Sequence, residues 1–467
     1  MLFPSISFLY YFLPFVLIMY FLVSAKYKNA VLLIASLFFY FYGEPKYLLL
    51  LVLASISGYL HGLWINKLRR GRYAVIPLIS SIVVGLSGLL YFKYTNFFIA
   101  NINSLFGSNI ALLKLVLPIG ISFYTFQILS YTIDVYRNEI AVQTKLLDFM
   151  TYVSLFPQLI AGPIVRYATV EQELNKRNHS LEKIAYGINR FIIGLAKKVV
   201  IANTLGELGN IFLHLDEKTV LFYWIFAMAF MLQIYFDFSG YSDMAFGLGR
   251  IFGFHFLENF NYPFVAKNMA EFWRRWHISL GTWFRNYIYI SLGGNRVSTL
   301  KWIRNVFIVW FLTGFWHGAQ WNFVVWGLYF ALFLVLEKML LNQILERLPV
   351  FLRHFYLLFF VLISFVIFNA DSLAESLNNL KGMFGLLKIP LSNDETIYYL
   401  KSYLLVFFLA IVSATPLIKK LMGKLLSWNW SKAVIDTARP FMQIVVLLII
   451  TGYLVDSSFN PFLYFRF

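Results

Sequence analysis

The sequence predicts an all-α protein that crosses a membrane many times. Of its 467 residues, 60% are hydrophobic and 13% are charged, whereas soluble domains carry about 25% charged residues. Apolar stretches near the ~20 residues that a spanning helix needs recur along the chain. The net charge of +17 would suit a nucleic-acid-binding protein. Its basic residues, however, lie in short clusters between apolar stretches, which is typical of cytoplasmic loops, so we expect a lipid bilayer as partner and no nucleic acid.

The apolar stretches are the candidate crossings. They lie near 5–24, 30–42, 47–64, 74–93, 111–133, 185–205, 219–237, 305–320, 322–337, 355–370, 402–418 and 440–455. Basic clusters follow alternate stretches, and placing them in the cytoplasm puts both termini outside. The first stretch has no basic n-region and no cleavage site, so we expect a retained span there. We find no internal repeat and predict one membrane-embedded domain over residues 1–467.

Three segments do not resemble simple spans. Residues 156–163 are apolar but contain two prolines, which predicts a re-entrant segment lining a cavity. Residues 268–300 mix tryptophan with arginine, which favours a helix at the inner interface or dipping partly into it. Residues 371–399 are polar and helix-forming, and are expected to form an external loop.

The absence of cysteine limits the chemistry. It excludes disulfides, thiolate metal sites and acyl-cysteine intermediates, so any nucleophile must be an oxygen or a nitrogen. No HExxH spacing, P-loop, GxGxxG or GxSxG context is found, so metal, nucleotide and hydrolase sites lack support.

His317 is the strongest candidate for function, because it stands in the apolar stretch 305–320, where an ionisable side chain is costly. We interpret it as a buried catalytic base. Gly314 and Gly318 flank it at small-xxx-small spacing, and close helix packing is the competing explanation for those glycines. His277 follows an aromatic and basic run and is the second candidate. The other histidines lie near span ends or in loops and are expected to be solvated or interfacial: His61, His179, His214, His255 and His354.

Other polar side chains lie within or near the spans: Asp134, Asp237, Asp243, Gln127 and Gln158. One interpretation is that they form hydrogen bonds between helices and fix packing; the other is that they mark a pathway. Asp134 and Asp243 either cap helices or pair with an arginine, namely Arg137, Arg274 or Arg275.

The chain ends in an aromatic tail at residues 460–467. The tail either anchors at the membrane interface or is buried in a cavity of the protein. Tyr464 has a further potential role: a phenol has a pKa near 10, so its ester is activated and can pass an acyl group to a sugar hydroxyl.

At these residues the sequence resembles the membrane-bound O-acyltransferase family, in particular the bacterial cell-envelope members that O-acetylate alginate or peptidoglycan. The matching stretches cover much of 118–330: FPQLIAGPI, YFDFSGYSDMAFGLGRIFG, NYPF, EFWRRWHISLGTWFRNYIYISLGGN and FLTGFWHGAQWNFVVWG.

The resemblance implies a ring of about 11–12 transmembrane helices around a central tunnel. It places His317 at the narrow midpoint, marks His277 as the second family histidine, and makes residues 460–467 an acyl-accepting motif with Tyr464 as acceptor. We expect the donor, acetyl-CoA or an acyl-carrier thioester, to bind near the 268–300 segment, with no bound cofactor. The candidate substrate-binding residues are Arg274, Arg275, Trp276, Trp316, Asp243 and Gln158.

The predicted function is therefore acetyl transfer across the bacterial cytoplasmic (inner) membrane for O-acetylation of peptidoglycan or alginate. An extracytoplasmic SGNH-type O-acetyltransferase is the expected partner. The alternatives are D-alanyl transfer to teichoic acid and a transporter or flippase without chemistry. A scaffold for an envelope complex would leave a buried histidine unexplained.

Overall fold

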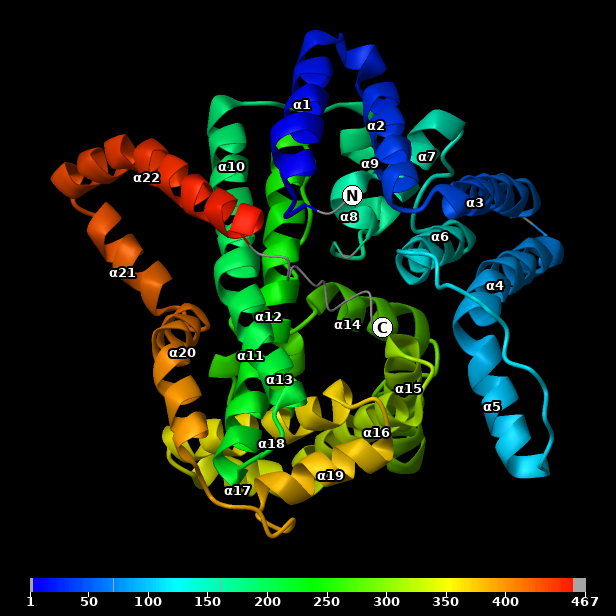
Figure 1. Cartoon of the computed structure of the whole chain (residues 1–467). Coiled ribbons are helices and arrows are strands. Elements are labelled where there is room, and N and C mark those ends of the chain that lie inside the picture. The colour runs from blue at the N-terminus through cyan, green and yellow to red at the C-terminus, as the bar shows by residue number, and fades with distance from the viewer. Residues whose placement is uncertain (1–2, 70, 161, 457–467) are drawn as a thin grey trace. The chain divides into compact units, whose positions relative to one another are not determined.

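The computed structural model describes residues 3–69, 71–160 and 162–456, and within these ranges every regular element is a helix (Figure 1). The chain divides into two compact units. The first comprises residues 1–191 and 244–257, and the second comprises residues 192–243 and 258–467. The predicted all-α class is confirmed, while the single membrane domain and the ring around a tunnel stay predictions.

Several helices have the length and composition to cross a membrane. In the described ranges there are seven, with Ser7–Leu22 a shorter apolar helix beside them: Pro45–Leu68, Arg72–Phe106, Val220–Phe252, Trp321–Arg347, Val350–Asn369, Asp394–Ser413 and Lys432–Asp456. The protein is therefore a multi-pass membrane protein, as its composition predicts.

The first unit begins at the N-terminus. Its α-helices are α1 Leu13–Leu22, α2 Lys28–Gly43, α3 Leu48–Leu68, α4 Val75–Leu89, α5 Thr95–Phe106, α6 Ile121–Tyr136, α7 Leu146–Ser154, α8 Phe156–Leu159, α9 Tyr167–Asn175 and the start of α10 Leu181–Ala196. π-helical turns precede α1 (Ser7–Phe12) and α5 (Leu90–Tyr94), and 3₁₀ turns precede α2 (Ala25–Tyr27), α3 (Pro45–Tyr47) and α4 (Arg72–Ala74).

Helix α6 begins ten residues later than the apolar stretch 111–133 predicts. Pro118 lacks an N–H, and Gly120 adopts a left-handed φ of +77° that most side chains disfavour, so the helix starts only at Ile121. Residues 109–118 have no regular structure. The apolar pattern alone did not reveal this turn.

The segment 156–163 is broken, as its prolines predict. Pro157 lies in the first turn of the four-residue α8, where a missing N–H costs nothing. Its described neighbours are buried, and the Phe156 amide donates to Ser36 Oγ over 3.0 Å. Its re-entrant membrane position stays a prediction.

The second unit contains the remaining helices. They are the π-helical turn Lys197–Ala202, α11 Asn203–His214, α12 Val220–Phe252 up to Asp243, the 3₁₀ turn Pro263–Val265, α13 Met269–Arg275, α14 Ile278–Phe284, the π-helical turn Arg285–Tyr289, α15 Thr299–His317, α16 Trp321–Leu336, the π-helical turn Glu337–Leu341, α17 Asn342–Arg347, α18 Val350–Asn369, α19 Leu373–Met383, α20 Asp394–Ser413, α21 Leu417–Leu426 and α22 Asn429–Asp456.

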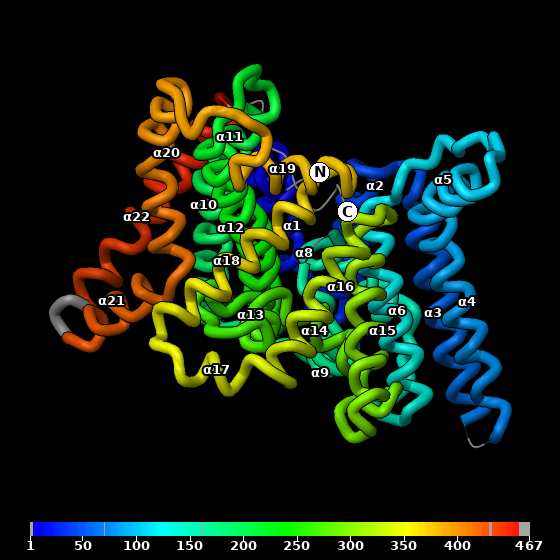
Figure 2. The backbone as a smooth tube through the Cα atoms, turned by 90° about the horizontal axis from the view of Figure 1, so that it is seen from below, coloured from blue at the N-terminus to red at the C-terminus, as the bar shows by residue number. Residues whose placement is uncertain are grey.

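An aromatic core holds the second unit together. α15 and α16 lie side by side in Figures 1 and 2, and α18 packs against α16. Phe330 of α16 contacts Trp273 of α13 and Trp310 of α15 at ring centroid distances of 4.8 and 5.4 Å. Burial of such large rings is the main stabilising term here.

The 268–300 segment differs from the single interfacial helix that the sequence predicts. It forms α13 and α14 with a bend at Trp276 and His277, because His277 has a left-handed φ of +45°. The Asn268 side chain caps α13 by accepting from the Glu271 amide over 2.7 Å. Phe272, Trp276 and His277 are buried, so the part of the segment around the bend belongs to the core, whereas Ile290 and Leu300 are exposed.

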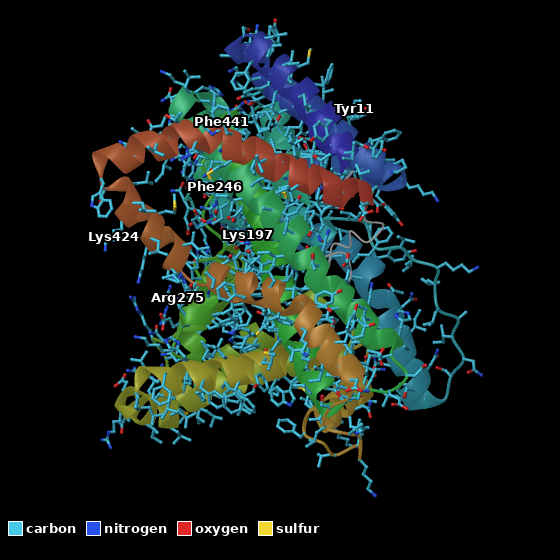
Figure 3. All side chains as sticks on the ribbon, turned by 60° about the vertical axis from the view of Figure 1, so that its left-hand side comes forward. Tyr11, Lys197, Phe246, Arg275, Lys424 and Phe441 are labelled. Carbon is cyan, nitrogen blue, oxygen red and sulfur yellow. The ribbon has the colours of Figure 1, made fainter. Side chains whose placement is uncertain are left out.

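Helices α21 and α22 present apolar side chains at the surface. Lys424 on α21 and Phe441 on α22 are both exposed (Figure 3). Leu421 and Leu425 of α21 are exposed too, whereas Lys419 and Lys420 point away from them on its helical wheel. This pattern is typical of a helix lying at a membrane surface.

Candidate active site

His317 is the last residue of α15, although the sequence placed it inside a span. The chain turns at Gly318 and enters α16 three residues later. The imidazole is 7% exposed and is surrounded by aromatic rings, with centroids 4.9 Å from Trp316, 5.0 Å from Trp326 and 5.3 Å from Phe368. The last carbonyls of a helix carry partial negative charge, so this position favours an imidazole that becomes positively charged.

Close contact between α15 and α16 fixes the backbone before His317. A Cβ on Gly314 would collide with the carbonyl oxygen of Phe323, and one on Gly327 with that of Trp310. The packing explanation for Gly314 is therefore confirmed. It does not compete with a role for His317, because the glycine contact sets where the histidine lies.

His277 lies in the bend between α13 and α14. It is 2% exposed, and burial lowers its pKa to about 3, so the ring is neutral at physiological pH. The loop before α13 holds this bend through two backbone hydrogen bonds: Asn261 N–H donates to Arg275 O, and Ile278 N–H donates to Asn259 O, both over 2.9 Å. Phe238 of α12 packs edge-on against the ring at 4.6 Å.

Trp316 connects the two histidines. Its ring centroid lies 4.9 Å from that of His317 and 6.2 Å from that of His277. Two histidines forty positions apart in the sequence therefore come within one indole of each other, inside one compact unit. This is the geometric centre of the candidate site.

The arginines before His277 differ in their surroundings. Arg274 is exposed, while Arg275 forms a salt bridge with Glu271 at 2.8 Å and also donates to Asn261 O. Burial raises the pKa of Glu271, but hydrogen bonds from the Lys267 amide and Arg275 outweigh it and leave that pKa below its usual value. Trp276 is packed in the core, stacked on Phe272 at 5.5 Å. Their substrate-binding roles stay predictions.

Two lysine–aspartate pairs, which the sequence pattern does not predict, lie in the second unit. Lys197 pairs with Asp243 at 2.7 Å, and the buried Lys198 pairs with Asp237 at 2.5 Å. Neither pair uses the arginines proposed for Asp243. The sequence nevertheless contains a signal for these pairs. Two lysines lie in the apolar stretch 185–205, and two aspartates lie in or just after the stretch 219–237. Opposite charges in buried helices are expected to pair.

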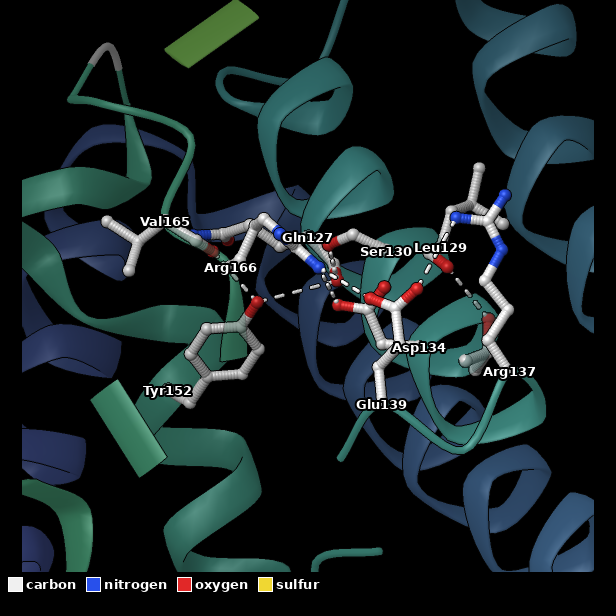
Figure 4. A network of polar contacts seen from close by, with 10 residues as sticks. Gln127, Leu129, Ser130, Asp134, Arg137, Glu139, Tyr152, Val165 and Arg166 are labelled. Atoms are coloured by element: carbon white, nitrogen blue, oxygen red, sulfur yellow. Dashed lines mark hydrogen bonds and ion pairs between the residues drawn. The ribbon is translucent and has the colours of Figure 1, made fainter. Parts of the chain in front are cut away.

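The polar residues of the first unit form a separate network. The fully buried Asp134 accepts from Arg166 at 2.9 Å, and Arg166 also donates to Glu139 (Figure 4). The 1%-exposed Gln158 donates to the carbonyl of Tyr152 over 2.7 Å. These contacts support the interpretation that the residues fix packing, and the substrate role of Gln158 stays a prediction.

The sequence also makes predictions about Tyr464 as acyl acceptor and about metal binding. Tyr464 and the rest of the 460–467 motif lie outside the described residues. Among the residues that the structure does describe, no group of three histidines or carboxylates is arranged to hold a metal ion.

Comparison with known proteins assigns the family. The model of the membrane-bound O-acyltransferase family matches residues 135–377, which include both histidines. The chain is similar to a probable alginate O-acetylase of Pseudomonas aeruginosa, with 43% identity over 82% of this chain and 75% of the relative. A peptidoglycan O-acetyltransferase of Helicobacter pylori is 36% identical over 83% of this chain and 80% of the relative. A teichoic acid D-alanyltransferase of Bacillus subtilis is 29% identical over 47% of this chain and 58% of the relative.

These similarities agree with the helical membrane architecture described above. The chain therefore belongs to the membrane-bound O-acyltransferase family, and it is a multi-pass membrane enzyme that transfers acyl groups to hydroxyls.

Proposed function

We propose that this enzyme moves an acetyl group from a cytoplasmic thioester donor, acetyl-CoA or an acyl carrier, across the bacterial inner membrane for O-acetylation of a cell-envelope polysaccharide. The relatives named for alginate and peptidoglycan acetylation support this acceptor class, because they align over most of the chain. The D-alanyltransferase aligns over less than half of it. The observation that carries the proposal is the contact of Trp316 with both buried histidines.

In the proposed step, a hydroxyl oxygen attacks the thioester carbonyl. The new C–O bond forms, the C–S bond breaks, and the hydroxyl proton passes to His317 and then to the leaving thiolate. General-base catalysis of this kind contributes a factor of about 10²–10⁴. The carbonyl end of α15 favours the transient imidazolium by about 0.3–1 kcal/mol. His277 either orients a substrate group or stabilises the negative charge that develops on the carbonyl oxygen.

The proposal includes a relay through the tail. Tyr464 is the first acceptor, and its acetyl ester then passes to an extracytoplasmic SGNH-type transferase or directly to the polymer. Because a phenol ester is activated, the second transfer is downhill.

Substitution of His317 tests the base. We expect His317→Ala to lower acetyl transfer in isolated membranes about 10²-fold or more, with normal amounts of protein in the membrane. His214→Ala is the matched control, because His214 is exposed at the end of α11. Wild-type activity in His317→Ala would contradict the proposed role.

Substitution of Tyr464 tests the relay. Tyr464→Phe removes only the hydroxyl, so we expect the amount of protein to be unchanged and polymer acetylation to be lost. Mass spectrometry of the wild-type enzyme during turnover should find an acetyl group on Tyr464. An unmodified tyrosine together with full activity of the phenylalanine variant would exclude the relay and leave direct transfer.

A further inference from the structure

Asn259 is a polar partner of His277 in the candidate site. It lies in the loop between α12 and α13, is 2% exposed, and places its side-chain oxygen 3.2 Å from Nδ1 of His277. The same oxygen accepts from the Ser279 amide over 3.1 Å and from the Ser279 hydroxyl over 2.9 Å. The Asn259 amide nitrogen donates to Ser242 Oγ of α12 over 3.2 Å.

The backbone contact identifies which Asn259 atom faces the ring. An amide side chain fits equally well with its oxygen and nitrogen exchanged, so its orientation must come from its partners. The Ser279 N–H is a backbone donor and has no lone pair to offer, so the atom it contacts must be the oxygen. That oxygen is an acceptor only, which means that Nδ1 of His277 must carry the hydrogen of their shared contact.

We propose that Asn259 is a positioning residue that holds His277 as the Nδ1–H tautomer, so that Nε2 presents a lone pair to the acyl-transfer site. Ser279 locks the asparagine oxygen, and the two backbone hydrogen bonds of the 259–261 loop hold the left-handed bend at His277. The position of the His277 ring and its tautomer are thus both set by this one loop.

The tautomer decides between the two roles of His277 in the proposed function, on which this inference rests. An Nε2 lone pair accepts a hydrogen bond or a proton, and it cannot donate to a carbonyl oxygen. His277 therefore orients an O–H or N–H group of a substrate and does not stabilise the developing oxyanion.

The uncharged groups that face the His277 ring support a neutral imidazole in one fixed tautomer. Phe238, Asn259 and Trp316 face the imidazole from α12, the loop and α15, and none of them is charged. Arg275 is paired with Glu271, and Arg274 is exposed. Burial is the cause of the lowered pKa of His277, so the ring remains neutral well below pH 7.

The tautomer can be measured without turnover. The full-length enzyme would be labelled with ¹⁵N in the imidazole rings of its seven histidines and studied in lipid nanodiscs by ¹H–¹⁵N NMR. The signals that disappear in His277→Gln belong to His277. We expect a protonated Nδ1 and an unprotonated Nε2 between pH 5 and pH 8. A proton on Nε2, or an imidazolium in this range, would overturn the inference, whatever the activity of the His317 and Tyr464 variants.

Variants of the loop separate positioning from general structure. Asn259→Asp keeps an acceptor for both Ser279 donors and adds a negative charge, so His277 should keep Nδ1–H but titrate at a pH at least one unit higher. Ser279→Ala is the matched control, since it removes one donor to Asn259 but not the contact with His277, and the tautomer should persist. An unchanged His277 titration in Asn259→Asp would show that Asn259 does not set the state of the ring.

Discussion

His277 carries a neutral imidazole in a place where an ionised one would be poorly solvated, and this has a consequence for stability. Burial lowers its pKa to about 3 in the folded protein, whereas an unfolded histidine titrates near 6.5. Below pH 6.5 the unfolded state therefore binds a proton that the folded state does not. The free energy of unfolding should fall as the pH falls from 6.5, by about 1.4 kcal/mol per pH unit at most.

The His277→Gln variant isolates this contribution, because glutamine keeps a side-chain donor for Asn259 but does not titrate. Between pH 8 and pH 5 the wild type should lose up to about 2 kcal/mol more of its unfolding free energy than the variant. Chemical unfolding of both proteins in one detergent measures the difference. Parallel pH dependences would mean that His277 takes up a proton in the folded state and that its burial is incomplete.

At the level of elements, the α15–α16 contact determines where His317 lies. Gly327→Ala would drive a methyl group into the Trp310 carbonyl, which lies on a helix that cannot give way cheaply. Overpacking of this kind costs about 1–3 kcal/mol. We expect lower thermal stability. Because the same methyl group would also press on the backbone of Gly314, three residues before His317, we expect a larger loss of acyl transfer than of protein.

Gly452→Ala in α22 is the matched control for that substitution. It is also a helical glycine, but a Cβ there meets nothing within 4 Å. Alanine should leave its stability unchanged or raise it by up to about 1 kcal/mol through helix propensity. Equal melting temperatures for Gly327→Ala and the wild type would show that α15 and α16 can move apart freely.

The sequence predicted the helices better than it predicted the turns between them. Apolar composition predicts membrane helices, and the free-energy cost of burying an ionisable side chain singles out His317. Both inferences depend on residue type alone. The late start of α6, the end of α15 at His317 and the bend at His277 depend on local backbone conformations that hydrophobic patterning does not encode. Asn259 was missed for a related reason: it lies eighteen residues from His277 and becomes its partner only through the loop.

The orientation of the chain in the membrane is a prediction that depends on the positions of its basic clusters. Lys419, Lys420 and Lys424 are expected in the cytoplasm, while the 371–399 segment is expected outside. α20, Asp394–Ser413, lies between these segments and is one of the helices long enough to cross. Positions on either side of α20 should therefore be accessible from opposite faces of the membrane.

A cysteine-free chain makes this prediction easy to test, because a single introduced thiol is labelled without background. Ser392 and Lys424 are both exposed, one before α20 and one on α21. A membrane-impermeant maleimide should label Ser392→Cys in intact spheroplasts and Lys424→Cys only after the membrane is opened. Labelling of both residues from outside would place the basic cluster at 419–424 outside the cell, contrary to the prediction. It would also put in question the side from which a cytoplasmic thioester reaches the two histidines. The orientation of α20 thus decides whether the donor and the acceptor approach the site from the faces that acetyl transfer across the membrane requires.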